Sequence, residues 1–156
     1  MKVAIGADNL GYELKEKVKK HLLEEGYDII DLGTTDIDNP ILYIEASDNV
    51  AKAIQNGEAE RGIVFCGTGM GVSIIANKHK GVYCACVESQ WAARESRIVN
   101  DANMIGLGGR IFGEGMAIDT VDTFLTTPFC QAPEARVKNL SGLLDQVKAF
   151  EEKQFV

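Results

Sequence analysis

One cysteine in the sequence stands at the start of a glycine-rich segment, where a thiol can take part in chemistry. Residues 66–71 read C-G-T-G-M-G, so Cys66 precedes three glycines in five residues. Residues 61–65 end in apolar side chains that suit a buried strand, and residues 72–78 suit a helix. Backbone N–H groups in such a turn stabilise negative charge. The segment therefore predicts either an anion site at the end of a strand or a tight turn with no site.

The surroundings of Cys66 favour proton transfer over hydrolysis. Amide donors next to a sulfur favour its thiolate, which can act as a nucleophile or as a general base. A thiol hydrolase also needs a partner histidine. His21 lies in the middle of a predicted helix and His79 follows the helix after the loop, so neither is well placed. The pattern thus favours removal of a proton next to a carbonyl group.

The other cysteines are expected to be structural. Cys84, Cys86 and Cys130 are interpreted as buried small hydrophobes, because most free cysteines are. No secretory segment precedes the first apolar run, and Cys84 and Cys86 alternate along one predicted strand. We therefore expect four free thiols in a reducing, cytoplasmic environment.

Short apolar runs alternate with longer amphipathic segments along the whole chain. This alternation is typical of parallel strands joined by right-handed helical crossovers. The predicted fold is α/β, a Rossmann-like three-layer sandwich around a five-stranded parallel sheet, with residues 1–156 forming a single domain. Strands are expected at residues 3–5, 27–32, 63–65, 82–87 and 104–107, and helices at 12–25, 42–55, 72–78, 91–98, 115–125 and 133–152.

Ligands of such sheets bind at the carboxyl ends of the strands. Residues 6–9, 66–71 and 100–101 are polar or glycine-bearing, and we expect them to meet at that edge. The last helix carries an apolar stripe of its own. It is expected to cover the sheet or to meet a second subunit.

Composition limits the partners and the cofactors. The net charge of −7 argues against nucleic acid and against an anionic membrane surface. No apolar run is long enough to cross a bilayer. No His, Cys or carboxylate cluster has ligand spacing, so we expect neither a metal nor another cofactor.

Several segments resemble one enzyme family, that of ribose-5-phosphate isomerase B and galactose-6-phosphate isomerase. The similar segments occur in order along nearly the whole chain. The resemblance implies aldose–ketose isomerisation of a small phosphosugar through a cis-enediolate, without a metal, in a homodimer or a tetramer. The segments are V-A-I-G-A-D (3–8), G-E-A-E-R-G-I (57–63), C-G-T-G-M-G (66–71), A-N-K (76–78), N-D-A-N (100–103), G-G-R-I-F-G (108–113) and F-L-T-T-P-F (124–129).

The resemblance also implies roles for individual residues. Cys66 would be the base that moves a proton between C1 and C2, with Thr68 assisting. The loop amides would hold the enediolate, and arginines would lie near the phosphate, one of them supplied across the dimer. The implied substrate-binding residues are Asp8, Asn9, Tyr43, Gly67, Gly69, Gly71, Asn100, Arg110 and Arg136.

Four departures from the family pattern bear on the substrate. The family often has D-H-A-G where this chain has D-N-L-G at residues 8–11, and it usually has a ring-opening histidine where this chain has Val99. The arginine-rich stretch after T-P-F leaves only Arg136, and residues 36–50 are longer than in ribose-5-phosphate enzymes. This pattern is similar to the erythritol-pathway branch, the D-erythrulose-4-phosphate isomerases.

The chemistry of a tetrose phosphate agrees with this interpretation. A furanose closes through the C4 oxygen, and in D-erythrose 4-phosphate that oxygen carries the phosphate. An enzyme that interconverts D-erythrulose 4-phosphate and D-erythrose 4-phosphate has no ring to open. The alternatives are that another group opens the ring of ribose 5-phosphate, galactose 6-phosphate or allose 6-phosphate, or that the chain is a non-catalytic phosphosugar-binding partner subunit. The presence of both Cys66 and Thr68 argues against the last alternative.

Overall fold

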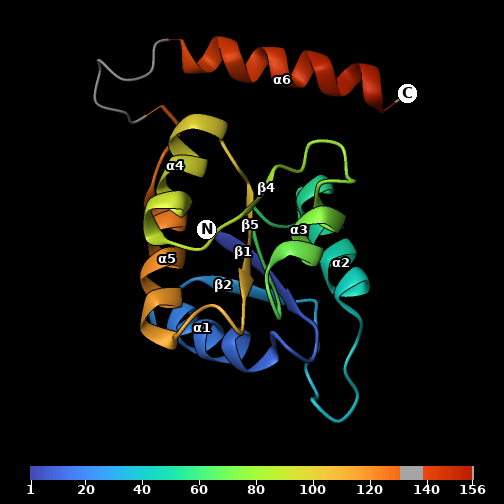
Figure 1. Cartoon of the computed structure of the whole chain (residues 1–156), viewed down its shortest axis with the longest axis vertical. Coiled ribbons are helices and arrows are strands. Elements are labelled where there is room, and N and C mark those ends of the chain that lie inside the picture. The colour runs from blue at the N-terminus through green and yellow to red at the C-terminus, as the bar shows by residue number, and fades with distance from the viewer. Residues whose placement is uncertain (131–138, 156) are drawn as a thin grey trace.

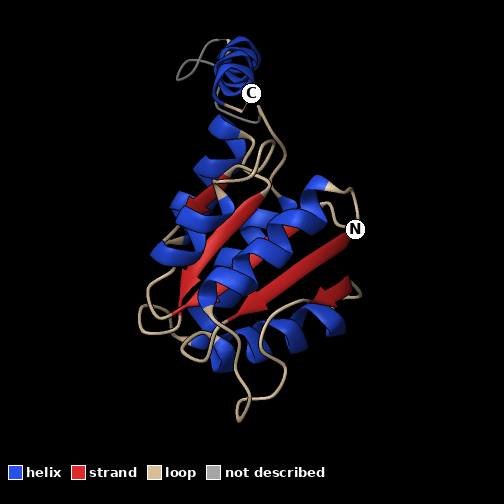
Figure 2. Ribbon diagram, turned by 90° about the vertical axis from the view of Figure 1, so that its right-hand side faces the viewer, coloured by secondary structure: helices blue, strands red, loops and turns tan. Residues whose placement is uncertain are grey.

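The chain forms a five-stranded sheet in which all neighbouring strands are parallel. The computed structural model describes residues 1–130 and 139–155. The strand order is β2-β1-β3-β5-β4, which confirms the predicted five-stranded parallel sheet. Figure 2 shows the strands running in one direction, with the loops that follow them gathered at one end. The strands are β1 (Lys2–Ala7), β2 (Asp28–Asp31), β3 (Arg61–Cys66), β4 (Cys84–Cys86) and β5 (Met104–Gly108).

Helices cover both faces of the sheet and give the predicted three layers (Figure 1). On one face are α1 (Tyr12–Glu24), α4 (Gln90–Asn100) and α5 (Glu114–Thr126), and on the other are α2 (Tyr43–Gln55) and α3 (Met70–Ala76).

Alternation along the strands divides the core into two apolar clusters. Ile63 and Phe65 of β3 pack toward α1 and α5, whereas Val64 and Cys66 pack toward α2 and α3. Burying an apolar side chain of this size contributes about 1.5–3 kcal/mol, so both layers are held mainly by such contacts. The thiol of Cys66 therefore points to the α2 and α3 side.

The connections place a topological switch point between β1 and β3. The chain leaves β1 through α1 to reach β2 on one side, and it leaves β3 through α3 to reach β4 on the other side. Adjacent parallel strands whose crossovers go in opposite directions leave a gap at their carboxyl ends, where ligands of this fold class bind. The register pairs Ala7 with Phe65 and Cys66 with Gly108, so β1, β3 and β5 end at nearly the same level.

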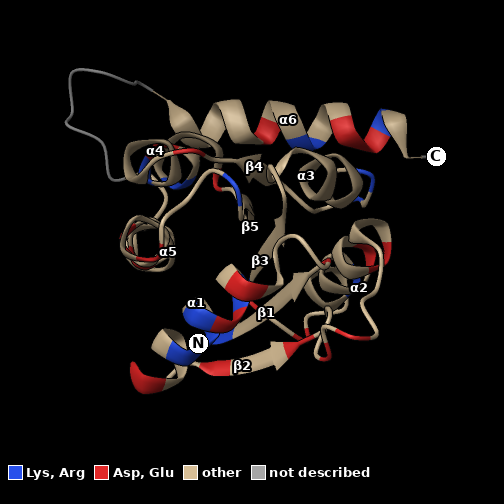
Figure 3. Cartoon of the chain, turned by 60° about the horizontal axis from the view of Figure 1, so that its bottom comes forward, with Lys and Arg blue, Asp and Glu red and all other residues tan. Residues whose placement is uncertain are grey.

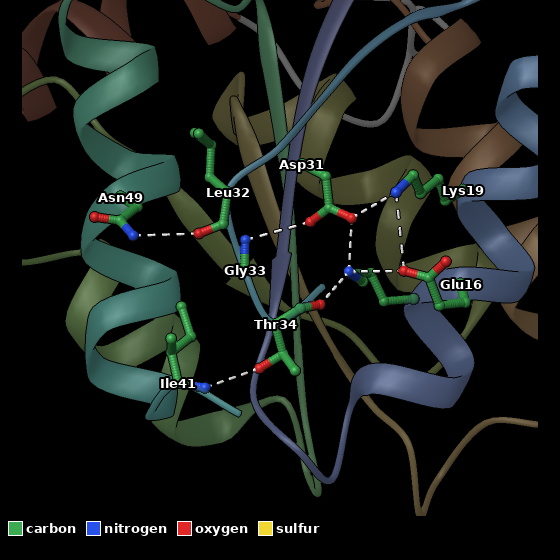
Figure 4. A network of polar contacts seen from close by, with 9 residues as sticks. Glu16, Lys19, Asp31, Leu32, Gly33, Thr34, Ile41 and Asn49 are labelled. Carbon is green, nitrogen blue, oxygen red and sulfur yellow. Dashed lines mark hydrogen bonds and ion pairs between the residues drawn. The ribbon is translucent and has the colours of Figure 1, made fainter. Parts of the chain in front are cut away.

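A buried polar network holds the segment that leads into α2 (Figure 4). The Lys15 side chain is fully buried, and its Nζ lies 2.6 Å from Asp31 Oδ2 and donates to the Thr34 carbonyl. The Thr34 N–H donates to Ala7 O at 2.8 Å, and Thr34 Oγ1 accepts from the Ile41 N–H at 3.1 Å. The segment between β2 and α2 is thus attached to the end of β1.

The same network sets the protonation of Asp31. Burial on its own would raise the pKa of the Asp31 carboxyl group. The ammonium groups of Lys15 and Lys19, at 2.6 and 2.8 Å, outweigh burial and lower that pKa below its ordinary value. Asp31 is therefore an ionised partner of two lysines, and it joins β2 to α1.

The last helix, α6 (Leu140–Gln154), crosses the amino ends of the strands (Figure 1). Glu151 accepts from the Gly81 N–H at 2.7 Å and from the Tyr83 hydroxyl at 2.9 Å. Burial and the Glu151 carboxylate raise the pKa of Tyr83 to about 12. The helix therefore covers an end of the sheet and not a face, and its predicted contact with a second subunit stays a prediction. The part of the predicted helix at 133–138 lies outside the described residues.

The outer surface of α6 combines apolar and charged side chains. Leu143, Val147 and Phe150 are 48%, 48% and 63% exposed, at spacings that place them along one side of the helix. Acidic and basic residues occur along α6 and together on α1 (Figure 3). Within residues 1–130 and 139–155, no helix has the length and apolar character that a membrane span requires.

A candidate active site at the carboxyl ends of β1, β3 and β5

Cys66 is the last residue of β3, and the loop that follows it is tied to the loop after β5. The Cys66 side chain is nearly buried, with the residue 6% exposed, and its Sγ accepts the Gly69 N–H at 3.1 Å. The Cys66 carbonyl accepts from the Gly109 N–H at 2.7 Å, and the Gly67 carbonyl accepts from the Arg110 N–H at 3.0 Å. These bonds fix the position of the thiol. An amide donor that contacts sulfur stabilises its thiolate form.

Asp8 lies beside this loop because β1 and β3 are neighbours. Its backbone N–H donates to Phe65 O at 3.3 Å, and its Oδ1 accepts the N–H groups of Leu10 and Gly11, each at 2.9 Å. Asp8 is buried, whereas Asn9 is exposed. The carboxylate is held rigidly by two backbone donors, an arrangement that suits recognition of a hydroxyl group.

Three other predicted residues border the loop. Thr68 is exposed at its mouth, where Thr68 Oγ1 accepts the Met70 N–H at 3.3 Å. Tyr43 begins α2, and its ring lies against Gly71: a Cβ built on Gly71 would be 2.9 Å from Tyr43 Cε2. A Cβ built on Gly67 would be 3.8 Å from Arg110 Cδ, so the arginine stem passes over the loop.

The structure corrects one prediction about this edge. Residues 100–101 were expected at the carboxyl ends of the strands, and they lie at the opposite end of the sheet. Asn100 ends α4, which runs back along the sheet after β4, and the Asn103 carbonyl then accepts from Gly62, near the start of β3. Val99 belongs to the same end of α4. A single chain therefore does not bring Asn100 to Cys66. Arg136 lies outside the described residues.

The two histidines are paired elsewhere. His21 Nε2 lies 2.9 Å from Asp122 Oδ1 on α5, and His79 Nε2 lies 2.8 Å from Asp48 Oδ1 on α2. The prediction that neither histidine serves Cys66 agrees with these contacts. Within the part of the chain that the structure describes, no group of three or more His, Cys, Asp or Glu residues is arranged to hold a metal ion.

The remaining cysteines differ in burial. All four cysteines are free thiols, as predicted. Cys84 is buried, and burial raises its pKa to about 12, so it stays protonated at neutral pH. Cys86 and Cys130 are exposed, so the prediction that they are buried was wrong. Cys86 ends the three-residue edge strand β4, which is shorter than the predicted strand at 82–87.

A cavity lies at the other end of the molecule, between α6 and the amino ends of β3 and β4. It has a volume of about 560 Å³, and its lining includes Arg61, Tyr83, Asp101 and Glu151. It contains no thiol and no glycine loop. The loop at Cys66 suits proton transfer to carbon better, because it combines a thiol with backbone donors.

Two residues at the loop, Leu10 and Ser73, were not among the site residues predicted from the sequence. The Leu10 side chain lies over the loop, with its Cδ1 3.1 Å from a Cβ built on Gly67. Ser73 lies one helical turn after Gly69, and its hydroxyl donates to the Gly69 carbonyl at 2.7 Å. The departure of D-N-L-G at residues 8–11 from the family pattern D-H-A-G could have indicated Leu10. A serine within a predicted helix gives no comparable signal.

The fold and the loop together place a thiol and backbone N–H donors at a topological switch point of an α/β sheet, where ligands of this fold class bind. Comparison with known proteins specifies the class. The family described as Ribose/Galactose Isomerase matches residues 3–140. A solved structure of ribose-5-phosphate isomerase B from Clostridium thermocellum is 38% identical, with a TM-score of 0.90 over 99% of each chain.

Two curated relatives act on four-carbon sugars by their names. The 4-deoxy-4-sulfo-D-erythrose isomerase of Clostridium sp. (strain MSTE9) is 46% identical over 153 residues, which are 97% of this chain and 96% of the relative. The D-erythrulose-4-phosphate isomerase of Pectobacterium atrosepticum is 32% identical over 83% of this chain and 85% of the relative. The chain belongs to the ribose/galactose isomerase family and is an aldose–ketose isomerase.

Proposed function

We propose that the protein interconverts the aldose and ketose forms of a four-carbon sugar that carries an acidic group on C4, with 4-deoxy-4-sulfo-D-erythrose as the preferred aldose. The observation that carries this proposal is the 46% identity with the 4-deoxy-4-sulfo-D-erythrose isomerase over nearly the full length of both chains. D-Erythrose 4-phosphate is the second member of the same substrate class, supported by the more distant erythrulose-4-phosphate relative.

Val99 supports a substrate that cannot form a furanose. In the sulfonated sugar, sulfur is bonded directly to C4, so no C4 oxygen exists to attack C1. In the phosphate ester that oxygen is blocked. Both substrates therefore present a free aldehyde, and an enzyme for them has no use for a ring-opening histidine at residue 99.

Leu10 supports a short substrate. Its side chain occupies space over Gly67, next to the stem of Arg110, at a position where the family often has alanine. A longer sugar would have to displace this side chain. Leu10→Ala is therefore expected to raise kcat/KM for a five-carbon substrate more than for a four-carbon one.

The proposed mechanism uses Cys66 as the base. The Cys66 thiolate removes the C2 proton of the aldose, and the electron pair moves to give a cis-enediolate whose negative charge rests on O1. A proton then moves from O2 to O1, and the Cys66 thiol returns its proton to C1, which yields the ketose. The loop N–H groups stabilise the enediolate oxygens, with Thr68 at the mouth of the loop, and Asp8 binds a sugar hydroxyl.

A second copy of the chain completes the site in this proposal. Support comes from the position of Asn100, which is exposed at the end of the sheet opposite Cys66, and from the exposed apolar residues of α6. The test applies if one copy supplies Cys66 and the other supplies Asn100. Inactive Cys66→Ala and Asn100→Ala chains are then mixed, and random pairing makes about half of the dimers hybrids with one intact site each. The mixture should therefore regain about a quarter of the wild-type sites. Recovery of no activity from the mixture would contradict the shared site.

The test of the substrate is a panel followed by NMR. The panel contains 4-deoxy-4-sulfo-D-erythrose, D-erythrose 4-phosphate, D-ribose 5-phosphate and D-galactose 6-phosphate. We expect the highest kcat/KM for the sulfonated tetrose. Preference for ribose 5-phosphate by tenfold, about 1.4 kcal/mol in transition-state free energy, would overturn the proposal. Binding without turnover of any sugar would favour the partner-subunit alternative.

A further inference from the structure

The carbonyl of Gly69 is held by a side chain one turn further along α3. Ser73 Oγ donates to Gly69 O at 2.7 Å, whereas the backbone N–H of Ser73 reaches the same oxygen at 3.3 Å. Ser73 is buried, so no water competes for this carbonyl. The hydroxyl therefore makes the shorter of the two bonds that orient the peptide between Gly69 and Met70.

Orienting that carbonyl also orients the N–H on the other side of the same peptide. A trans peptide is planar, and its N–H points opposite to its C=O. With the Gly69 carbonyl directed toward Ser73, the Met70 N–H is directed to the mouth of the loop, where it contacts Thr68 Oγ1 at 3.3 Å. The preceding peptide donates its Gly69 N–H to Cys66 Sγ. Ser73 thus holds one of these two peptides directly, and the Gly69 Cα joins that peptide to the one that donates to sulfur.

The surroundings of Ser73 favour this orientation of its hydroxyl. Gly106 of β5 leaves the necessary space, because a Cβ there would lie 2.2 Å from Ser73 Oγ and 2.7 Å from Gly69 O. The Cys84 thiol donates to Ser73 Oγ at 3.6 Å. Since burial keeps Cys84 protonated, the serine oxygen accepts from that thiol and its own hydrogen is available to the Gly69 carbonyl.

We infer that Ser73 is a positioning residue for the isomerisation: its hydroxyl fixes the Gly69–Met70 peptide so that the loop amides point at the enediolate and at the sulfur of Cys66. The inference rests on the proposed function for its kinetic readout only. Its physical content is the geometry around the thiol, which can be measured without a sugar.

The experiment compares Ser73→Ala with the matched control Ser96→Ala. Ser96 is also buried within a helix, and its hydroxyl donates to the Ala93 carbonyl at 2.8 Å, but it belongs to α4. For Ser73→Ala we expect kcat to fall on the order of tenfold with little change in KM. Removing an anion-stabilising donor lowers kcat by about 10²–10³-fold, and a donor that is only misdirected should lower it less. Ser96→Ala should keep wild-type kcat.

A second readout follows the thiol directly. The rate at which iodoacetamide alkylates Cys66 is measured at neutral pH, in variants that retain the other cysteines and with the modified residue identified by mass spectrometry. In Ser73→Ala this rate should fall, because the sulfur loses a well-directed donor. In Ser96→Ala it should equal the wild-type rate. Ser73→Thr should behave more like wild type than Ser73→Val does, because those two side chains differ mainly in the hydroxyl.

The outcomes separate this inference from the proposed function. Unchanged alkylation and kcat within twofold of wild type in Ser73→Ala would overturn the positioning role. Equal behaviour of Ser73→Thr and Ser73→Val would do the same. If wild-type protein isomerises none of the tetroses, the proposed substrate fails, whereas the alkylation rates still decide the role of Ser73.

Discussion

A single methyl group added at Gly106 should damage the fold and the site together. In Gly106→Ala the new Cβ would lie 2.2 Å from Ser73 Oγ and 2.7 Å from Gly69 O, far short of the 3.4 Å at which ordinary contact begins. Overpacking of this kind costs about 1–3 kcal/mol. Loss of the bond from Ser73 to Gly69 adds about 1 kcal/mol. We expect a total of roughly 2–4 kcal/mol, which for a chain of this size lowers Tm by about 4–16 °C.

The assay is urea and thermal unfolding followed by circular dichroism, combined with a double-mutant cycle. Ser73→Ala removes the atom that the new methyl meets first, so the double variant should be more stable than the sum of the single losses predicts, by about 1–2 kcal/mol. Gly115→Ala is the control, because a Cβ there meets nothing within 4 Å. It should be neutral or stabilising by about 0.4–1 kcal/mol. Losses that add to within about 0.5 kcal/mol would refute the stated contact.

Three further predictions concern the base, the metal and the pH dependence. Cys66→Ala should fold normally and lose about 10²–10⁴-fold in kcat, whereas Cys130→Ala should keep it; near-native turnover in Cys66→Ala would show that the base is another group. Exhaustive chelation should leave kcat unchanged, because the loop amides carry the enediolate charge, and activity lost on chelation but restored by Zn²⁺ or Mn²⁺ would contradict this. The pKa of Asp31 is lower in the folded state than in the unfolded state. The contribution of Asp31 to the free energy of unfolding is therefore fully present above its unfolded-state pKa, and it is lost as the pH falls through its folded-state pKa. Urea unfolding of Asp31→Asn should therefore depend less on pH below about 4 than that of wild type, and parallel curves would contradict the pairing.

The sequence predicts the strands and helices well, and it predicts less well which end of the sheet a connecting residue occupies. Apolar runs such as residues 63–65 are set by local pattern, and β3 and its neighbours form as expected. The position of Asn100 was predicted wrongly. Asn100 ends α4, which runs antiparallel to the strands, so it lies where β5 begins and not where the strands end. Deciding which end of the sheet Asn100 occupies requires the direction of α4, a tertiary feature.

Some residues of the site can be predicted from the sequence, and others are brought there only by the fold. Cys66, Thr68 and the glycines form one continuous segment, so their proximity follows from the chain itself. Tyr43 is brought to Gly71 by the path of the segment before α2, which depends on the buried ion pair of Lys15. A buried lysine in an amphipathic helix is indistinguishable in sequence from the solvated lysines around it. Its partner on β2 only becomes evident in three dimensions.

The two backbone bonds that join the loop after β3 to the loop after β5 also bear on which step of the catalytic cycle limits turnover. A loop whose carbonyls at Cys66 and Gly67 are already taken by Gly109 and Arg110 cannot swing away as a lid without breaking both bonds. We therefore expect substrate to enter and leave while this loop stays in place, without a slow opening of the loop before the chemical step. If Cys66 is the base, we therefore expect breaking of the bond between C2 and its hydrogen to limit turnover, and an aldose deuterated at C2 should react with a primary isotope effect.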